Sequence, residues 1–227
     1  MKNFLVSYIY RLWDNRVKPI KAIKAIIALS KDNEDTTQVF HVIDALKGSS
    51  DRKYFKIFSK SKIGKKILKE RVHLVNTLKD KEALSKLPKN TLGYKYYEFI
   101  YKENLSPEEL IEASESSKKE FGNRTDDEIF FNTRKRDMHD LWHVTTGYGR
   151  DPLGELSLLA FTYAQEQNRG IGAIALYGYW KVGREFPDFN LRKVIREGYK
   201  NGKNATLWSC EDWEKLIKLP IDEVREK

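Results

Sequence analysis

The segment 125–170 constrains the fold of this chain more than any other, because it predicts two helices joined by a short loop. The first helix starts with a capping-box pattern, in which the Thr125 side chain caps the helix and Glu128 bonds back to the cap. Gly147 is suited to end that helix. Asp151-Pro152 then supplies a cap and a first residue for a second helix, which we expect to run to about residue 170. A loop this short makes the two helices antiparallel neighbours.

These two helices carry residues at the spacing of a metal site. His139 and His143 are four residues apart, so both imidazoles can face one ion from one side of a helix. His143 lies about one turn before the first helix ends, and Glu155 lies about one turn after the second begins. The carboxylate is therefore predicted to lie level with His143. Two imidazoles and a carboxylate suit Zn²⁺ or a similar divalent metal, with an open position for water or substrate.

Asp140 has three alternative roles. It follows His139 directly, so it is rotated about 100° away around the helix. It could be a fourth ligand, an acid/base group, or a carboxylate just outside the ligand set. Arg136 lies four residues earlier and could hold Asp140 in place by an ion pair. A His-xxx-His pair alone is a weak sign of a metal site, and it is Asp140 and the matched position of Glu155 that strengthen it.

Composition limits the class of protein and its partners. With 227 residues the chain is long enough for one domain. Cys210 is the single cysteine, which excludes an internal disulfide framework and suits a reducing compartment. Lysine and arginine number 42 against 33 acids, for a formal charge of +9. Residues 1–31 include seven basic residues and one acidic residue, and residues 51–71 include nine basic residues and two acidic ones. No nucleic-acid motif accompanies them, so we expect an anionic membrane surface as partner rather than nucleic acid.

Hydrophobic periodicity predicts an all-α fold. No segment alternates convincingly over the length of a strand, and apolar residues recur at helical spacing along the chain. We therefore expect a single-domain bundle of roughly eight to ten helices over residues 1–227, with a basic and apolar N-terminal segment at 1–40. Helices are expected at Met1–Trp13, which could lie in a membrane interface or pack on the core, and after Ser106-Pro107. A further helix follows Pro19, with these apolar residues at helical spacing: Ile20, Ile23, Ile26 and Ile27.

The least polar part of the chain runs from Leu156 to Trp180. Residues 170–180 carry no charge and include several small residues, and the run is too short to span a bilayer. Small residues either let helices pack closely or leave room for a slender apolar ligand. They also make a homodimer a reasonable expectation. A helix is expected from Asn190 to about Lys200, with a break at Gly202, followed by a last short helix.

Several motifs together resemble one known family. They are the histidine motif 139–143 with Glu155, Thr146-Gly147-Tyr148, and the ending Trp213-Glu214-Lys215-Leu216. This combination resembles the family of the fourth coenzyme Q (ubiquinone) biosynthesis protein, whose hallmark is His-Asp-x-x-His-x11-Glu. The resemblance extends over roughly residues 40–227, with the metal site within 125–170. The first 40 residues do not match clearly.

The resemblance implies a mostly helical protein that binds a divalent metal, usually taken as zinc, through His139, Asp140, His143 and Glu155. It also implies action on polyprenylated aromatic rings. Members are linked to removal of the ring carboxylate of a polyprenyl-hydroxybenzoate, with hydroxylation at the same carbon in some accounts, and to organising the ubiquinone-biosynthesis proteins at a membrane. We therefore expect a peripheral membrane protein, cytoplasmic in a bacterium, or on the matrix side of the inner mitochondrial membrane in a eukaryote.

If this resemblance holds, individual residues can be given roles in the reaction. Asp140 could pass a proton, and Arg150, just beyond the first helix, could pair with an anionic group of the substrate. The apolar region 156–180 could hold the prenyl tail. Three alternatives remain open: a non-enzymatic lipid-binding scaffold with a structural metal, metal-assisted hydrolysis of the His-Glu-x-x-His type, and a phosphohydrolase built on the His-Asp pair.

Overall fold

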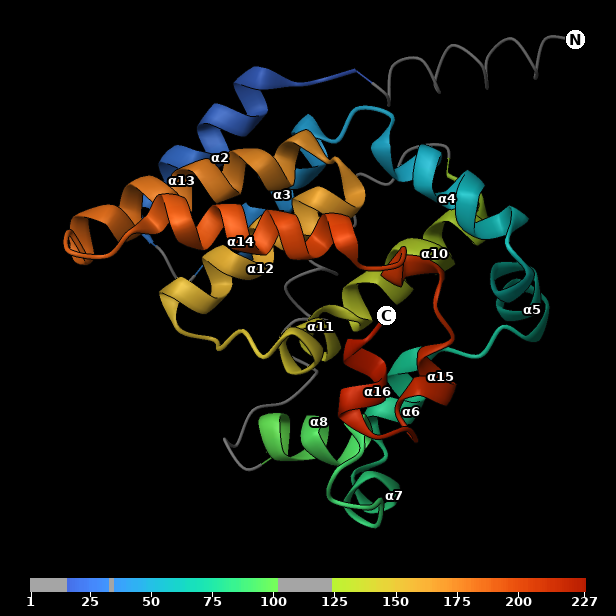
Figure 1. Ribbon diagram of the computed structural model, residues 1–227. Coiled ribbons are helices and arrows are strands. Elements are labelled where there is room, and N and C mark those ends of the chain that lie inside the picture. The colour runs from blue at the N-terminus through green and yellow to red at the C-terminus, as the bar shows by residue number, and fades with distance from the viewer. Residues whose placement is uncertain (1–15, 33–34, 102–123) are drawn as a thin grey trace, which may run out of the picture.

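A computed structural model describes residues 16–32, 35–101 and 124–227 (Figure 1). The predictions for Met1–Trp13 and for a helix start at Ser106 lie outside these residues. The described chain forms these helices, in order: α2 (Pro19–Lys31), α3 (Thr36–Leu46), α4 (Ser50–Lys60), α5 (Lys62–Glu70), α6 (Leu74–Lys79), α7 (Lys81–Ser85), α8 (Leu92–Tyr101), α10 (Asp126–Asp137), α11 (His139–Thr146), α12 (Pro152–Glu166), α13 (Arg169–Glu185), α14 (Leu191–Asn204), the 3-10 helix η2 (Trp208–Cys210), α15 (Trp213–Leu216) and α16 (Ile221–Arg225).

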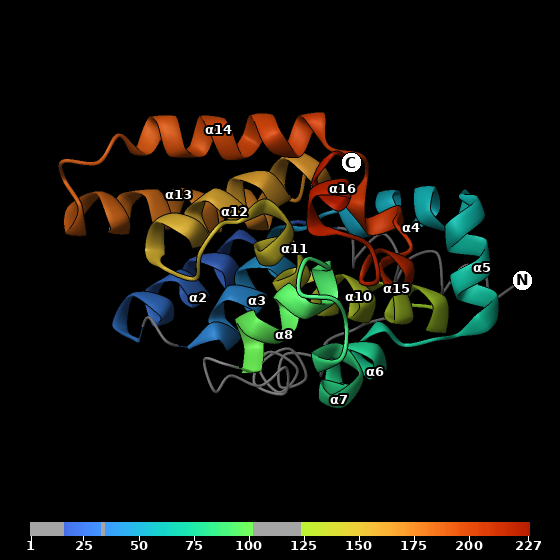
Figure 2. The ribbon, with the colours of Figure 1, turned by 60° about the horizontal axis from the view of Figure 1, so that its bottom comes forward.

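The predicted all-α class is confirmed. Within the described ranges the backbone forms no strand, and Thr91 and Pro220 make only an isolated bridge. None of the described helices combines the length and the apolar character that crossing a bilayer requires. The helices form two packed groups, with α2, α3, α12, α13 and α14 on one side and α6, α7, α8, α15 and α16 on the other (Figures 1 and 2). Helix α11 lies between the two groups.

Helices α12 and α14 pack unusually closely, because two glycines of α14 lie against the backbone of α12. A Cβ on Gly198 would lie 2.5 Å from the carbonyl oxygen of Ser157, and one on Gly202 would lie 2.4 Å from that of Phe161. Both distances are shorter than van der Waals contact allows. This approach fixes α12, which carries Glu155, against the outer helix α14 (Figure 2).

A second core supports α11 from the other side. Leu141, Trp142 and Val144 of α11 pack with buried side chains of α8, α15 and α16. The ring of Trp142 lies edge-on to those of Phe161 and Trp208, with centroids 5.8 and 5.6 Å away. Helix α11 is thus buried on most sides, and the residues of the histidine motif have little freedom to move.

Four details differ from the sequence-based expectations. The helix expected from Thr125 to Gly147 divides at Met138, where ψ is −14° and departs from the usual α-helical value of about −42°. Helix α12 ends at Glu166 rather than near 170, because Gln167 takes the left-handed conformation and Asn168 caps α13. Helix α14 continues through Gly202, where the missing side chain permits packing on α12.

The fourth difference concerns α2. The sequence pattern marks its isoleucines as the apolar face, yet the residues that are buried against α3 are Ala22, Ala25 and Leu29. Alanines allow the backbones of α2 and α3 to approach closely, which leaves Ile20, Ile23 and Ile27 exposed.

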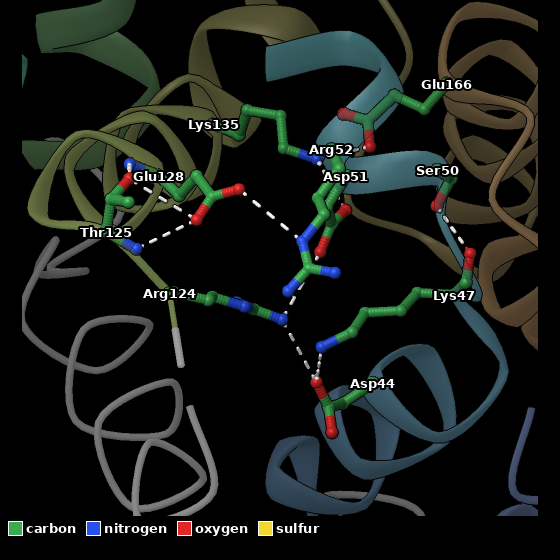
Figure 3. Close-up of polar contacts among 10 residues, drawn as sticks. All are labelled: Asp44, Lys47, Ser50, Asp51, Arg52, Arg124, Thr125, Glu128, Lys135 and Glu166. Carbon is green, nitrogen blue, oxygen red and sulfur yellow. Dashed lines mark hydrogen bonds and ion pairs between the residues drawn. The ribbon is translucent and has the colours of Figure 1, made fainter. Parts of the chain in front are cut away.

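A partly buried network of charges joins α3 and α4 to α10 and α12 (Figure 3). Lys135 of α10 reaches Asp51 of α4 at 3.3 Å and Glu166 of α12 at 2.7 Å. Arg124 approaches Asp51 at 3.6 Å and Asp44 at 3.4 Å. Positive and negative side chains alternate through this network, so the charges stabilise one another away from water.

The same network shifts the ionisation of its members. Burial by itself would raise the pKa of Asp51, but the charges of Lys135, Arg124 and Lys47 outweigh it and hold the pKa below its ordinary value. Burial would lower the pKa of Lys135, but Glu166 and Asp51 raise it instead. Both groups are therefore charged at neutral pH.

Gly202→Ala is predicted to destabilise the fold by about 1–3 kcal/mol, since the new Cβ has no room against α12. Gly178→Ala is the matched control, because a Cβ there would lie 3.5 Å from Cδ1 of Leu156, an ordinary contact. That control should gain up to about 1 kcal/mol from its higher helix propensity. Urea unfolding measures both, and equal stabilities for the two variants would contradict the close packing of α12 and α14.

The depressed pKa of Asp51 predicts a specific acid sensitivity. A carboxyl group whose pKa is lower in the folded state contributes stability that is present above the ordinary pKa of 3.8 and is lost as the pH falls through the folded-state pKa. The free energy of unfolding should therefore fall below about pH 4, and Asp51→Asn should lower stability at neutral pH and flatten this acid dependence. The exposed Asp188→Asn is the control and should leave the pH profile unchanged.

Candidate metal centre

Local sequence signals set the two elements of the site as predicted. Thr125 and Glu128 form both bonds of the capping box, and Gly147 ends α11 in the left-handed conformation with φ of 75°. The side chain of Asp151 accepts from the backbone N–H groups of Leu153 and Gly154, and Pro152 opens α12. The turn between α11 and α12 is thus fixed at both ends.

His139, His143 and Glu155 meet across this turn. One ligand atom from each residue lies within 4.8 Å of the others. Nε2 of His143 is 3.3 Å from Oε1 of Glu155, which is the level position that the helix lengths predict. The rings of His139 and His143 are edge-on with centroids 4.8 Å apart. These three residues form a group that could hold a metal ion.

The hydrogen bonds of His143 leave its second nitrogen available. Nδ1 lies 3.0 Å from the backbone carbonyl oxygen of Tyr148, and because a carbonyl only accepts, the ring must donate its proton there. Nε2 is then the lone-pair nitrogen of the neutral ring. It is buried and has no hydrogen-bond partner in the part of the chain that the structure describes, since the nearby Glu155 carboxylate lies within ion-pair distance but outside hydrogen-bond geometry. A buried unpartnered nitrogen beside a carboxylate fits a metal ligand.

Asp140 faces His139 rather than the centre of the group. Its Oδ1 lies 3.3 Å from Nδ1 of His139, where an ionised carboxylate accepts the ring proton. Burial would raise the pKa of Asp140, but the bond to His139 and the charges of His139 and Arg150 outweigh it and hold the pKa below its ordinary value. For His139, burial alone would lower the pKa, but the bond to Asp140 and the charges of Asp140 and Glu155 outweigh burial and raise the pKa above its ordinary value. This pairing orients a histidine so that its other nitrogen can bind metal. Asp140 as a fourth ligand stays a prediction.

Arg136 was expected to pair with Asp140. In the structure its Nη2 donates a hydrogen bond to Oδ1 of the adjacent Asp137 at 2.6 Å instead.

Arg150 lies where its charge acts on both His139 and Asp140. Its guanidinium is 5.4 Å from the ring centroid of Phe99. The ring of Phe99 in turn stacks on His143, at 5.8 Å and 25°. The site thus has an aromatic wall from α8 and a positive charge beside it.

The sequence gives no sign of Phe99 or of the Tyr148 carbonyl, although both contact His143. Phe99 lies among tyrosines whose spacing suggests an ordinary core stripe. The role of the Tyr148 carbonyl cannot be predicted from sequence, because every residue has a backbone carbonyl. The C-terminal residues also support the site. Nε of Arg225 donates to the carbonyl of Thr145 at 2.9 Å, and Glu214 accepts from Arg134 at 2.7 Å. Arg225 thus holds the end of α11, and Glu214 holds α10.

The predicted apolar ligand region is largely core. Leu156, Leu158, Phe161, Ile171 and Ile174 are buried among neighbouring helices. Gly170 lies against the backbone of α3, where a Cβ would come within 2.4 Å of the Ile43 Cα. Close helix packing, one of the two interpretations of the small residues, therefore applies to this end of the run. Leu176 and Trp180, farther along α13, are exposed.

Comparison with known proteins agrees with the motif. The family model described as "Coenzyme Q (ubiquinone) biosynthesis protein Coq4" matches residues 19–227. The chain belongs to the Coq4 family. The match begins at the start of α2. The resemblance by motif begins only at about residue 40, so the family match extends farther toward the N-terminus.

Relatives from fungi and animals share moderate identity with it. The mitochondrial ubiquinone biosynthesis protein COQ4 of Scheffersomyces stipitis is 30% identical over 172 residues, which cover 72% of this chain and 49% of the relative. The mitochondrial COQ4 homolog of Aedes aegypti is 30% identical over 173 residues, which cover 72% of this chain and 57% of the relative. The chain thus spans about half the length of the curated relatives it matches.

A solved structure shares the fold. The crystal structure of a candidate ubiquinone biosynthesis protein from Nostoc punctiforme superposes with a TM-score of 0.64 at 23% sequence identity. The match covers 93% of this chain and 97% of the other. At this identity the likeness shows the common helical fold.

His143→Ala is predicted to abolish binding of a divalent metal, because it removes a ligand nitrogen that the Tyr148 carbonyl holds in place. The purified protein should bind about one ion per chain, measured by elemental analysis after dialysis. His41→Ala is the matched control and should retain the metal, since His41 lies on α3 away from the group. Metal retention by His143→Ala, with the fold intact by circular dichroism, would contradict the assignment.

Proposed function

We propose that this protein removes the ring carboxylate of a polyprenylated hydroxybenzoate in ubiquinone biosynthesis, with a divalent metal, of which zinc is our choice, held by His139, His143 and Glu155. The observation that carries the proposal is the buried Nε2 of His143, which has no hydrogen-bond partner among the described residues and faces the Glu155 carboxylate. Family membership supplies the pathway, since the relatives' names assign them to ubiquinone biosynthesis.

The site is open on one side, as catalysis requires. The side chain of Glu155 is 41% exposed while that of His143 is fully buried. Three protein ligands leave at least one position of a tetrahedral ion for a substrate oxygen. A bound metal supplies Lewis acidity that stabilises negative charge on a coordinated carboxylate or phenolate. A metal enclosed by four protein ligands would instead favour the scaffold alternative.

The protein's own residues position the substrate and the ligands. Arg150 places a positive charge beside the open side and pairs with an anionic group of the ring. Phe99 supplies an aromatic wall next to His143 and beneath the Arg150 guanidinium. Asp140, ionised at neutral pH, holds His139 through Nδ1. In this proposal Asp140 acts as a positioning residue, and its role in passing a proton stays a prediction.

The reaction breaks the bond between the ring carbon and the carboxylate carbon. The electron pair stays on the ring, a proton from solvent takes the vacated position, and CO₂ leaves. In the oxidative form, water supplies the hydroxyl group that replaces the carboxylate, and dioxygen as external oxidant accepts the electron pair and two protons to become hydrogen peroxide. Removal of CO₂ is common to both forms.

The proposal includes a location and partners. We place the protein at the surface of an anionic membrane, where prenylated substrates are held, together with other ubiquinone-biosynthesis proteins. For a eukaryotic chain this is the matrix side of the inner mitochondrial membrane, in keeping with relatives that are named mitochondrial. For a bacterial chain it is the cytoplasmic face of the membrane.

Release of labelled CO₂ from a carboxyl-labelled hydroxybenzoate with a short prenyl tail tests this function. Metal-loaded wild type should release CO₂, metal-stripped protein should lose activity and regain it on reloading, and His143→Ala should lose it by at least about a hundredfold. His41→Ala should keep full activity. A wild type that holds metal and releases no CO₂, with and without dioxygen, would favour a lipid-binding scaffold with a structural metal.

A further inference from the structure

Helix α2 carries its largest apolar side chains on the outside. Ile20, Ile23 and Ile27 are 72%, 56% and 51% exposed, whereas the alanines of the opposite face pack on α3. Their spacing of three and four residues sets the isoleucines in one row along the helix. We call this row the isoleucine ridge. Three exposed isoleucines in a row form an apolar patch, which in a folded protein marks a contact surface.

Basic side chains accompany the ridge. The described segment 16–31 contains five basic residues and no acid: Arg16, Lys18, Lys21, Lys24 and Lys31. Lys21, Lys24 and Lys31 are exposed on α2 itself. A helix with an aliphatic row beside lysines matches a partner that is apolar inside and negatively charged at its surface, which describes a bilayer with anionic lipids.

Helix α13 presents a second apolar surface beside the first. Both α2 and α13 pack on α3, and they run next to each other in Figures 1 and 2. Leu176 of α13 is 70% exposed and Trp180 is 55% exposed. The guanidinium of Arg184 lies 5.1 Å from the Trp180 ring centroid. Tryptophan and arginine are the side chains that settle at the level of lipid headgroups.

We propose that the isoleucine ridge of α2, with Leu176 and Trp180 of α13, docks this protein on the surface of an anionic bilayer. This docking surface rests on the proposed function, which places the protein at a membrane, and it names the residues that make the contact. A second copy of the chain fits this surface less well. A two-fold contact through α2 would set lysines against lysines, with no acid on the helix to offset them.

The α13 part of the docking surface lies beside α12, the helix that carries Glu155. Helices α12 and α13 pack as neighbours, and Gly178 of α13 faces Leu156, the residue after Glu155. Trp180 is therefore level with the start of α12. Packed helices have axes about 8–10 Å apart, so docking through Trp180 would bring the lipid surface alongside the helix next to α12.

Co-sedimentation of the full chain with vesicles tests the surface. Wild type should bind vesicles of phosphatidylcholine containing phosphatidylglycerol, bind phosphatidylcholine alone at least about tenfold more weakly, and lose binding as salt rises. The triple variant Ile20→Ser, Ile23→Ser, Ile27→Ser should bind the anionic vesicles at least about tenfold more weakly than wild type. The matched control is Ile57→Ser with Val72→Ser, which removes other exposed aliphatic side chains, 42% and 44% exposed, and should bind like wild type.

The outcomes separate this inference from the enzymatic proposal, because vesicle binding needs no substrate. With a water-soluble short-tail substrate, the triple variant should keep the CO₂ release of wild type if the enzyme proposal holds. Vesicle binding by the triple variant equal to that of wild type would overturn the docking surface. So would a wild type that is dimeric and ignores vesicles while the triple variant is monomeric, since the ridge would then bind a second copy.

Discussion

The candidate site depends on one hydrogen bond, from Nδ1 of His143 to the backbone carbonyl of Tyr148. It fixes the ring orientation and the tautomer together, and it leaves a buried lone pair on Nε2 with no hydrogen-bond partner within residues 16–32, 35–101 and 124–227. Such an atom costs free energy unless something binds it, so the geometry favours a cation next to Glu155. Tyr148 belongs to the turn that joins α11 to α12, and the same turn sets the height of Glu155.

Much of the remaining structure holds that turn in place. Arg225 of α16 donates to the carbonyl of Thr145 at the end of α11. The Arg134–Glu214 pair anchors α10, from which α11 continues. The charge network around Lys135, drawn in Figure 3, anchors the same helix. On the other side, the glycines of α14 hold α12 at close range. The C-terminal motif and the histidine motif are therefore parts of one arrangement, although they lie far apart in the sequence.

The sequence predicts those features that depend on neighbouring residues. The capping box at Thr125, the cap at Asp151 and the approach of Glu155 to His143 follow from local spacing, and the structure contains them. Features that depend on a packing partner were not predictable. The path of α14 through Gly202 requires the facing backbone of α12, and the alanine face of α2 requires α3. Likewise, Phe99 reaches His143 only through the packing of α8 on α11.

The central claim is that His139, His143 and Glu155 hold one divalent metal at an open position. Anomalous diffraction from crystals of the metal-loaded protein tests it most directly. The account predicts one strong peak at about 2.0–2.2 Å from a nitrogen of each histidine and a carboxylate oxygen of Glu155, with at least one position not taken by protein. A peak elsewhere, or no peak at this turn in metal-loaded crystals, would contradict it.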